Sequence, residues 1–217
     1  MFEEVLGELA EPISKIGTRA TELGIRLVVH PDRYVVLNSD RPEVIENSIK
    51  ILATHARIFD MLGLLRSPWA LINIHGGGGD RSMHLIDTIR NLPESIRLRL
   101  TLENDEYTYS ASDILEIYQA AEIPMVFDAH HHVIHEQLDS YEDPSIAEMV
   151  LAARTTRKPP EWQLVHISNG STSFRDPKHS DLITAMPSAY RNIDWIEIEA
   201  KHKEKAIDLL RQTWLVK

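Results

Sequence analysis

Six short apolar runs in this sequence each end in a histidine or a carboxylate. Neutral imidazole nitrogens and carboxylate oxygens are donors that together hold clusters of divalent metals. If the runs are parallel strands, their carboxyl ends share one face, which in a (β/α)8 barrel carries the chemistry. The pattern therefore predicts a metal cluster. The runs are Ile25–His30, Ala70–His75, Leu98–Glu103, Pro124–Asp128, Trp162–His166 and Asp194–Glu199.

The strand ends suggest separate roles for the polar residues. Glu103 has two carboxylate oxygens and is expected to bridge two ions, whereas a histidine offers one nitrogen. Asp128 and His131 lie three residues apart, close enough to serve neighbouring ions. A single strand-end histidine is commonly a hydrogen-bonded structural residue, but six coordinated strand ends favour metal binding. The remaining predicted ligands are His30, His75, His166, His179 and Glu199, and spacing alone does not choose among His130, His131, His132 and His135.

The composition restricts the chemistry further. The 217 residues include no cysteine, which excludes thiolate zinc sites and disulfides and fits a reducing cytoplasm. The formal charge of −10 argues against nucleic acid as a partner, but bound divalent cations reverse the local field. The acidic start predicts no signal peptide, and no run is long enough for a membrane span. We therefore expect a cytoplasmic protein without a membrane partner.

Apolar runs alternate with helix-like segments along the chain, which is typical of βαβ units and a parallel sheet. A doubly wound sheet also fits, but the first run lacks a Gly-x-Gly-x-x-Gly fingerprint. We predict one domain over residues 1–217, a TIM-type (β/α) barrel with six of eight strands visible. Ser39 or Asp40, and Ser112, are the expected N-caps. Helices are expected over residues 2–22, 42–64, 80–92, 112–121, 144–154 and 202–210, with an apolar stripe at Val5, Leu9, Ile13 and Ile16 on the first, and a histidine-rich loop follows Asp128.

Two further segments allow two interpretations each. Gly76–Gly79 resembles a phosphate-binding loop but lacks the Lys and Ser/Thr of a Walker A motif, so a tight turn is equally consistent. Lys201 begins a cationic segment that indicates either phosphate contact or a solvated helix start. His55, His84 and His202 fall in predicted helices, where solvent-facing roles are expected.

Seven ordered motifs resemble those of the UV damage endonucleases. The resemblance implies a TIM-type barrel related to endonuclease IV that nicks double-stranded DNA 5′ of ultraviolet photoproducts. It also implies two or three divalent ions, manganese first, with magnesium, zinc or cobalt as alternatives. The motifs are His30–Tyr34, Asn73–Gly77, Leu102–Glu106, Phe127–His132, Val165–Ser168, His179–Asp181 and Glu199–Glu204.

The resemblance also assigns residues. Arg33 and Tyr34 stand where the family places a side-chain pair that probes the damaged duplex. Lys201 is expected to bind DNA and to stabilise charge at a phosphate, with Glu103 as the second catalytic candidate. The implied metal ligands are His30, His75, Glu103, Asp128, His131, His166, His179 and Glu199.

The sequence departs from the family pattern in three ways. The family's N-terminal portion, with its first two strands, has no counterpart here, so we expect an incomplete barrel whose open edge favours self-association. Leu164 stands where a lysine is common, and Arg33 where glutamine is usual. Two alternatives stay open at this point: a metal-dependent sugar isomerase on a related barrel, and a metal- or DNA-binding remnant with impaired catalysis.

Overall fold

The computed structural model describes residues 2–215 and divides into two compact units, Met1–Thr101 and Leu102–Lys217. Strand β2 (Leu100–Glu103) begins in the first unit and ends in the second. The prediction of one domain over residues 1–217 therefore stays a prediction. Within the described residues, every helix is too short or too polar to cross a membrane.

The helices of the first unit follow the predicted order with shifted ends. The helix expected over residues 2–22 is interrupted at Leu9. The long helix begins at Pro42 after the N-cap Arg41, so the expected caps Ser39 and Asp40 are wrong; the Ser39 hydroxyl instead accepts from the Arg41 backbone N–H. The helices are α1 (Phe2–Glu8), α2 (Ala10–Glu22), α3 (Pro42–Met61), α4 (Ser82–Arg90) and α5 (Glu94–Arg97).

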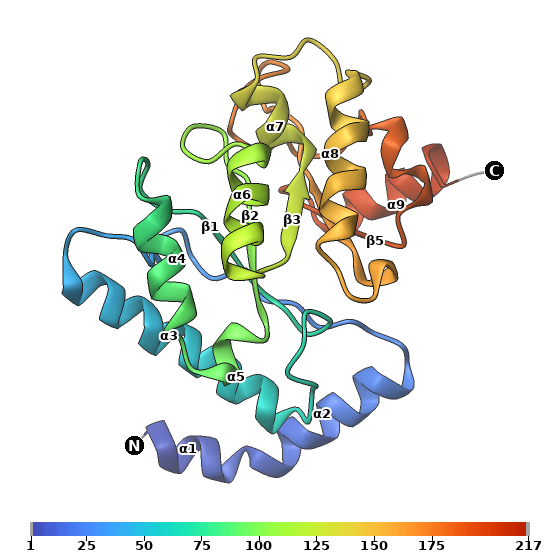
Figure 1. The fold of residues 1–217 in the computed structure, drawn as a ribbon. Helices are drawn as coiled ribbons and strands as arrows, with labels where there is room; N and C mark the ends of the chain where they lie inside the picture. Colours follow the sequence, from blue (N-terminus) through green and yellow to red (C-terminus); the bar gives the residue numbers. More distant parts are fainter. Residues whose placement is uncertain (1, 216–217) are drawn as a thin grey trace. The chain divides into compact units, whose positions relative to one another are not determined.

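Helix α2 packs on the end of α3 through its small residues rather than through its apolar stripe (Figure 1). A Cβ atom on Gly17 would lie 1.8 Å from the carbonyl oxygen of Leu62, so only glycine permits this approach. Of the predicted stripe, Ile16 in α2 is 58% exposed, and Val5 in α1 and the N-cap Leu9 are 45% and 44% exposed. The close backbone contact therefore sets which face of α2 is buried.

The predicted strand Ile25–His30 is not a strand; it forms one bridge, between Val29 and Ile72. The Val29 N–H donates to the carbonyl of Leu71 at 3.0 Å, and its carbonyl accepts from the Asn73 N–H at 2.8 Å. The Ile25 N–H is already bonded to Ala20 at the end of α2. The start of this run therefore caps a helix instead of extending a sheet.

Five strands form the sheet in the order β1-β2-β3-β4-β5 among the described residues. Pairs β2–β3, β3–β4 and β4–β5 are parallel, and Asp128 and His166 are register partners. Strands β2, β3 and β4 are buried along their whole length, as expected for parallel strands covered on both faces. Besides β2, the strands are β1 (Ile72–His75), β3 (Met125–Asp128), β4 (Leu164–Ile167) and β5 (Trp195–Ile198).

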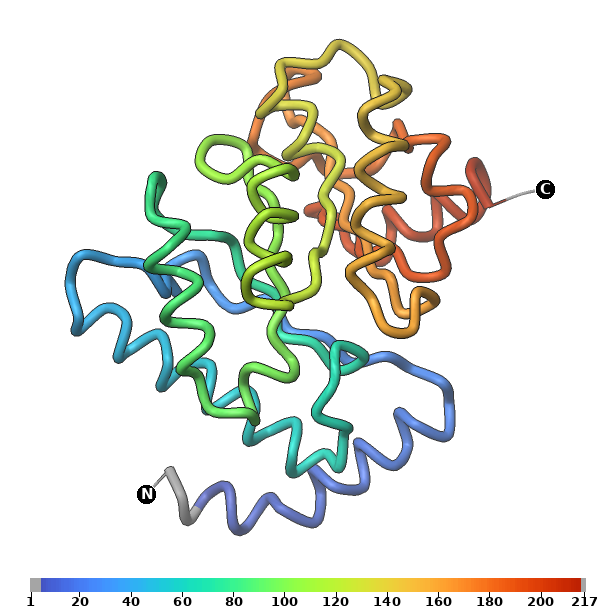
Figure 2. The backbone as a smooth tube through the Cα atoms, in the orientation of Figure 1, coloured from blue at the N-terminus to red at the C-terminus, as the bar shows by residue number. Residues whose placement is uncertain are grey.

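In the second unit, α6 and α8 pack against β3 (Figure 1). Ser110, not Ser112, caps α6 and forms a capping box with Asp113. The predicted histidine-rich loop is wrong, because those residues form helix α7. Residues 168–187 contain no helix or strand (Figure 2). The helices are α6 (Ala111–Ala121), α7 (Ala129–His135), α8 (Pro144–Thr155) and α9 (Glu204–Thr213), with short 3-10 turns η1 (Pro160–Trp162) and η2 (Ser188–Asn192).

The predicted fold class is confirmed: the chain is an α/β protein with parallel strand pairs. Over the described residues the sheet has five strands, one fewer than predicted, and it does not close into a barrel. Because parallel strands present their carboxyl ends at the same edge, the fold gathers the polar ends of β2, β3, β4 and β5 in the second unit.

Candidate metal centre

The centre of the site is a group of two carboxylates and one imidazole in the second unit, of which Glu103 and His166 are buried and Glu199 is partly exposed. Glu103 ends β2, His166 lies in β4, and Glu199 follows β5. The His166 Nδ1 lies 3.2 Å from Glu103 Oε2 and 3.2 Å from Glu199 Oε1. One ligand atom from each residue lies within 4.8 Å of the others. These three strand ends therefore converge as the sequence predicts.

A second group shares Glu199 with the first. One ligand atom from each of His131, His179 and Glu199 lies within 4.8 Å of the others. The His179 Nε2 is 3.6 Å from Glu199 Oε2. The His131 Nδ1 is 2.9 Å from the Asn104 carbonyl, so Nδ1 carries the donated hydrogen and, when the ring is neutral, Nε2 is the nitrogen with the lone pair. A histidine held this way has the tautomer of a metal ligand.

Asp128 both builds α7 and offers an oxygen to the site. Its Oδ1 caps the helix by accepting from the backbone N–H groups of His130 and His131, at 2.6 and 2.8 Å. Its Oδ2 is buried and has no hydrogen-bond partner among the described residues. A buried carboxylate oxygen without a partner is unfavourable, and a cation would satisfy it. The oxygen and nitrogen donors of this site thus fit a divalent metal.

The geometry separates the four histidines that spacing could not. His130 contacts Tyr141 through Nδ1 and the Asp176 carbonyl through Nε2, so both its nitrogens are engaged. The His132 Nε2 is 3.0 Å from the Ser145 hydroxyl. The remaining one, His135, contacts the Asp105 carbonyl through Nδ1. Of these histidines, the structure brings His131 to the carboxylates.

Electrostatics indicate that the centre attracts positive charge. Burial alone would lower the pKa of His131, but Asp128 and Glu103 outweigh it and raise this pKa to about 9. For His166, burial is likewise outweighed by Glu103, and the pKa lies well above its ordinary value. Burial would raise the pKa of Glu199, yet the hydrogen bond to His166 keeps it below its usual range. The carboxylates of this site therefore stabilise positive charge, and a bound metal would take the place of protons on the imidazoles.

In the first unit, His30 and His75 lie side by side, with ring centroids 5.2 Å apart. The His30 Nδ1 is 3.0 Å from the Pro31 carbonyl. Arg33 and Tyr34 follow in the same loop, and the Arg33 guanidinium lies 5.6 Å from the centroid of the Tyr34 ring. Tyr34 is 69% exposed, which leaves its ring accessible on the surface of this unit.

The glycine segment after β1 is a turn. The Gly78 N–H donates to the Asn38 side chain at 2.9 Å, and the Asn38 amide donates back to the Gly78 carbonyl at 2.8 Å. Gly77 has φ of +84°, and a Cβ there would lie 2.4 Å from Asn38 Oδ1. The Gly78 N–H group is therefore used within the protein, which favours the turn over the phosphate loop.

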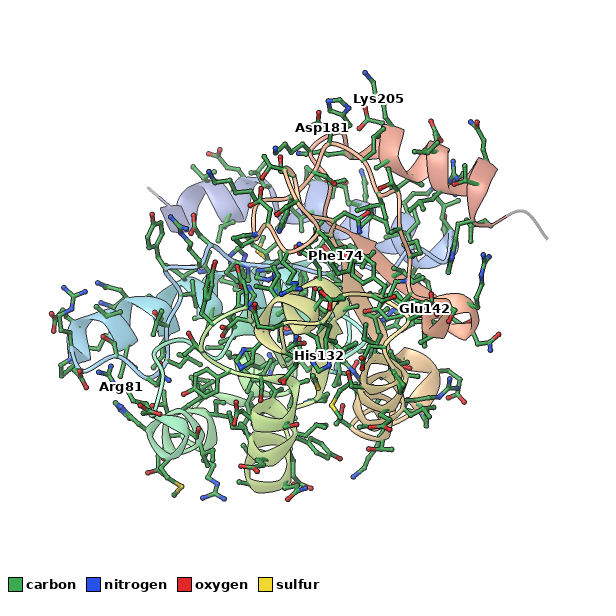
Figure 3. The ribbon with its side chains drawn as sticks, turned by 90° about the horizontal axis from the view of Figure 1, so that it is seen from above. Arg81, His132, Glu142, Phe174, Asp181 and Lys205 are labelled. Carbon is green, nitrogen blue, oxygen red and sulfur yellow. The ribbon has the colours of Figure 1, made fainter. Side chains whose placement is uncertain are left out.

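Lys201 lies on an exposed face of the second unit. Its Nζ is 3.4 Å from the Ser171 hydroxyl and 4.0 Å from Asp181. The Asp181 carbonyl accepts from the backbone N–H of His202 at 3.0 Å, and the side chains of Asp181 and Lys205 extend outward in Figure 3. His202 falls in a turn before α9, so its predicted helical position is wrong; His55 and His84 lie in α3 and α4 as predicted.

Three residues near the centre were not predicted. Glu197 Oε2 lies 3.1 Å from His166 Nε2. Asn104 accepts from the Asp128 N–H and donates to the Asp128 carbonyl, both at 2.9 Å. The buried Tyr190 hydroxyl donates to the His166 carbonyl at 2.9 Å. Glu197 precedes Glu199 by two residues on a strand, and this spacing is the signal that was available.

Comparison with known proteins identifies the family. The family model described as UV-endonuclease UvdE matches residues 2–215. The chain belongs to this UV-endonuclease family. It is 61% identical over 212 residues to a protein named UV DNA damage endonuclease from Nostoc sp., covering 98% of this chain and 66% of that relative. The chain thus spans about two thirds of the relative's length, and the predicted resemblance is confirmed.

Solved structures agree with this assignment. A crystal structure of SacUVDE matches with a TM-score of 0.79 and 30% identity, over 94% of this chain and 72% of that one. Endonuclease IV from Thermus thermophilus matches with a TM-score of 0.64 and 16% identity, over 94% of each chain, which shows the fold alone. The predicted relation to the endonuclease IV fold is confirmed, and the family match does not support a sugar isomerase.

Proposed function

We propose that this chain is a metal-dependent DNA repair endonuclease that nicks the backbone 5′ of ultraviolet photoproducts. The family supports this class of activity. The observation that carries the proposal is the buried Asp128 Oδ2, which lacks a partner among the described residues, next to a backbone that places His131 beside Glu103. Burying a carboxylate oxygen without a partner raises the free energy of the folded protein, and a bound cation would offset this penalty.

The proposed ligands form two sets. Those of the second unit are supported by their mutual distances and burial. His30 and His75 are proposed from their proximity to each other in the first unit and from the sequence motifs that contain them. Two or three ions, with manganese first and magnesium, zinc or cobalt as alternatives, agree with a donor set of only nitrogen and oxygen. The ligands of the second unit are Glu103, Asp128, His131, His166, His179 and Glu199.

The protein side chains would act on the DNA in distinct ways. Bound metal would supply an activated water and neutralise the scissile phosphate. Glu103 would orient the imidazoles of His131 and His166, because one of its carboxylate oxygens faces each of these rings. Tyr34 and Arg33 would fill the space left by unstacked damaged bases. Lys201 would add positive charge near a phosphate.

The test combines metal content with DNA nicking. Purified protein is loaded with Mn²⁺, its metal content is measured, and irradiated and unirradiated supercoiled plasmids are incubated with it. We expect relaxation of the irradiated plasmid only. Glu103→Gln should lower metal content and abolish nicking while leaving helical content intact. Glu148→Gln, on an exposed part of α8, is the matched control and should behave as the wild type.

Three outcomes would contradict parts of the proposal. Unchanged metal content in Glu103→Gln would remove Glu103 from the site. Metal binding without nicking by the wild-type chain would favour the remnant with impaired catalysis. Equal relaxation of irradiated and unirradiated plasmid would reject specificity for photoproducts.

The proposed surroundings of the enzyme follow from its substrate. We place it in the bacterial cytoplasm, where it would meet double-stranded DNA, in line with its Nostoc relative. Self-association across the open sheet edge stays a prediction, which sedimentation over a series of protein concentrations would test.

A further inference from the structure

Strand β5 places a second carboxylate against His166. Glu197 lies in β5 and Glu199 directly follows it, with its N–H still bonded to the Ile167 carbonyl of β4 at 2.9 Å. Residues two apart in this extended segment therefore place their side chains on the same face. In the parallel pairing of β4 with β5, Glu197 is the register partner of His166. This register places Glu197 beside the His166 imidazole and places Glu199, just after the end of β5, at the proposed metal centre.

The two nitrogens of His166 face different groups. Nδ1 points to the proposed metal ligands, 3.2 Å from both Glu103 Oε2 and Glu199 Oε1. Nε2 lies 3.1 Å from Glu197 Oε2. Since the two nitrogens of an imidazole point in diverging directions, Glu197 cannot share an ion with Nδ1. Its side chain is 34% exposed, while that of His166 is fully buried.

We propose that Glu197 is a positioning residue, whose carboxylate, 3.1 Å away, would accept the Nε2–H of metal-bound His166 and thereby present the Nδ1 lone pair to the metal. This inference rests on the proposed metal-dependent function and deepens it. A carboxylate behind a ligating histidine fixes its tautomer and ring orientation and raises its basicity. The same principle applies to His131, whose Nδ1 contacts the backbone carbonyl of Asn104 instead of a carboxylate.

The experiment measures metal affinity and the state of the ring separately. Zn²⁺ is titrated by calorimetry into metal-free wild type, Glu197→Ala, Glu197→Gln and the control Glu148→Gln. We expect the affinity to fall about 10- to 100-fold in Glu197→Ala and less in Glu197→Gln, which keeps an uncharged acceptor. Thermal unfolding of the metal-free proteins shows whether each variant folds, and Glu197→Gln serves if Glu197→Ala does not.

Nitrogen NMR of the histidine rings supplies a readout that a purely structural role would not move. In the Zn²⁺-loaded wild type, we expect a slowly exchanging Nε2–H on His166 and a metal-bound Nδ1. In Glu197→Ala, that proton should exchange with water much faster. Metal bound through Nε2, or unchanged affinity and exchange in a folded Glu197→Ala protein, would overturn the inference.

The outcomes distinguish this inference from the proposed function. If wild type and Glu197→Ala bind Zn²⁺ equally and wild type still nicks irradiated plasmid, only the role of Glu197 is rejected. If wild type fails to bind Zn²⁺ and Mn²⁺, both the metal centre and the role of Glu197 are rejected.

Discussion

Asp128 offers a test in which one side chain has two separable tasks. Its Oδ1 caps α7 through two backbone N–H groups, and its Oδ2 is the proposed metal ligand. Asp128→Asn keeps an oxygen for the cap but replaces Oδ2 with an amide that cannot bind a cation. Asp128→Ala removes both tasks. Because both variants lose the charge, the difference between them isolates the cap.

The magnitudes follow from these two tasks. In metal-free protein, Asp128→Ala should be less stable than Asp128→Asn by about 0.5–2 kcal/mol, the usual contribution of an N-cap side chain. With Mn²⁺ at 100 times its dissociation constant, wild type should gain about 2.7 kcal/mol. If losing the ligand weakens binding 100-fold, the gain of Asp128→Asn at the same Mn²⁺ concentration falls to about 0.4 kcal/mol.

Urea unfolding followed by circular dichroism, with chelator and then with Mn²⁺, measures all of these differences. The slope of unfolding against urea should stay constant among the three proteins, so that midpoints report stability. An equal gain from Mn²⁺ in wild type and Asp128→Asn would show that Oδ2 holds no metal. Equal metal-free stability of the Ala and Asn variants would reject the capping assignment.

Two further predictions concern the first unit. Tyr34→Ala should lose stacking of the tyrosine ring on DNA bases, worth roughly 1–3 kcal/mol. Its preference for irradiated over intact DNA should therefore fall in a competition binding assay, while its metal content stays constant. Equal discrimination by the variant and the wild type would assign Tyr34 to packing. Hydrogen bonds from Arg66 and then from Arg99 hold the pKa of the Asp60 carboxyl below its usual range. The ionised carboxylate therefore stabilises the fold above about pH 4, and this stabilisation is lost as the pH falls through the lower pKa of the folded state. Asp60→Asn should therefore be less stable than wild type by about 1 kcal/mol at pH 7, and their urea midpoints should converge as the pH falls through the lowered folded pKa of Asp60; a constant difference would refute this pairing.

The ends of the strands could be predicted from the sequence because a run of apolar residues stops there at a carboxylate or a histidine. Leu100–Glu103 and Met125–Asp128 are buried strands that end in a carboxylate, and the predicted runs contain both. A parallel sheet aligns such ends without any further information. The α/β class was therefore accessible from residue order alone, and the family was indicated separately by the resemblance of the seven motifs.

The sequence was less informative where local preferences compete. Ser112 was predicted as the N-cap of α6, but Ser110 is the N-cap because it forms reciprocal hydrogen bonds with Asp113. Ile25–His30 has the composition of a strand, yet its first N–H continues the end of α2 and only Val29 finds a partner in the sheet. Whether a segment pairs as a strand depends on the neighbouring strand in the folded protein, and this cannot be predicted from the segment's own residues.

The tertiary structure decided which side chains meet. Four histidines follow Asp128 closely, and the helix that Asp128 caps turns His131 toward Glu103 while its neighbours contact other groups. The contact of Glu197 with His166 depends on the register of β5 against β4. Residue order thus determined the donors and the strand ends that carry them, because burial pattern is local. Helix phase and strand register are set by packing between distant segments, so only the folded chain assigns each nitrogen and oxygen its partner.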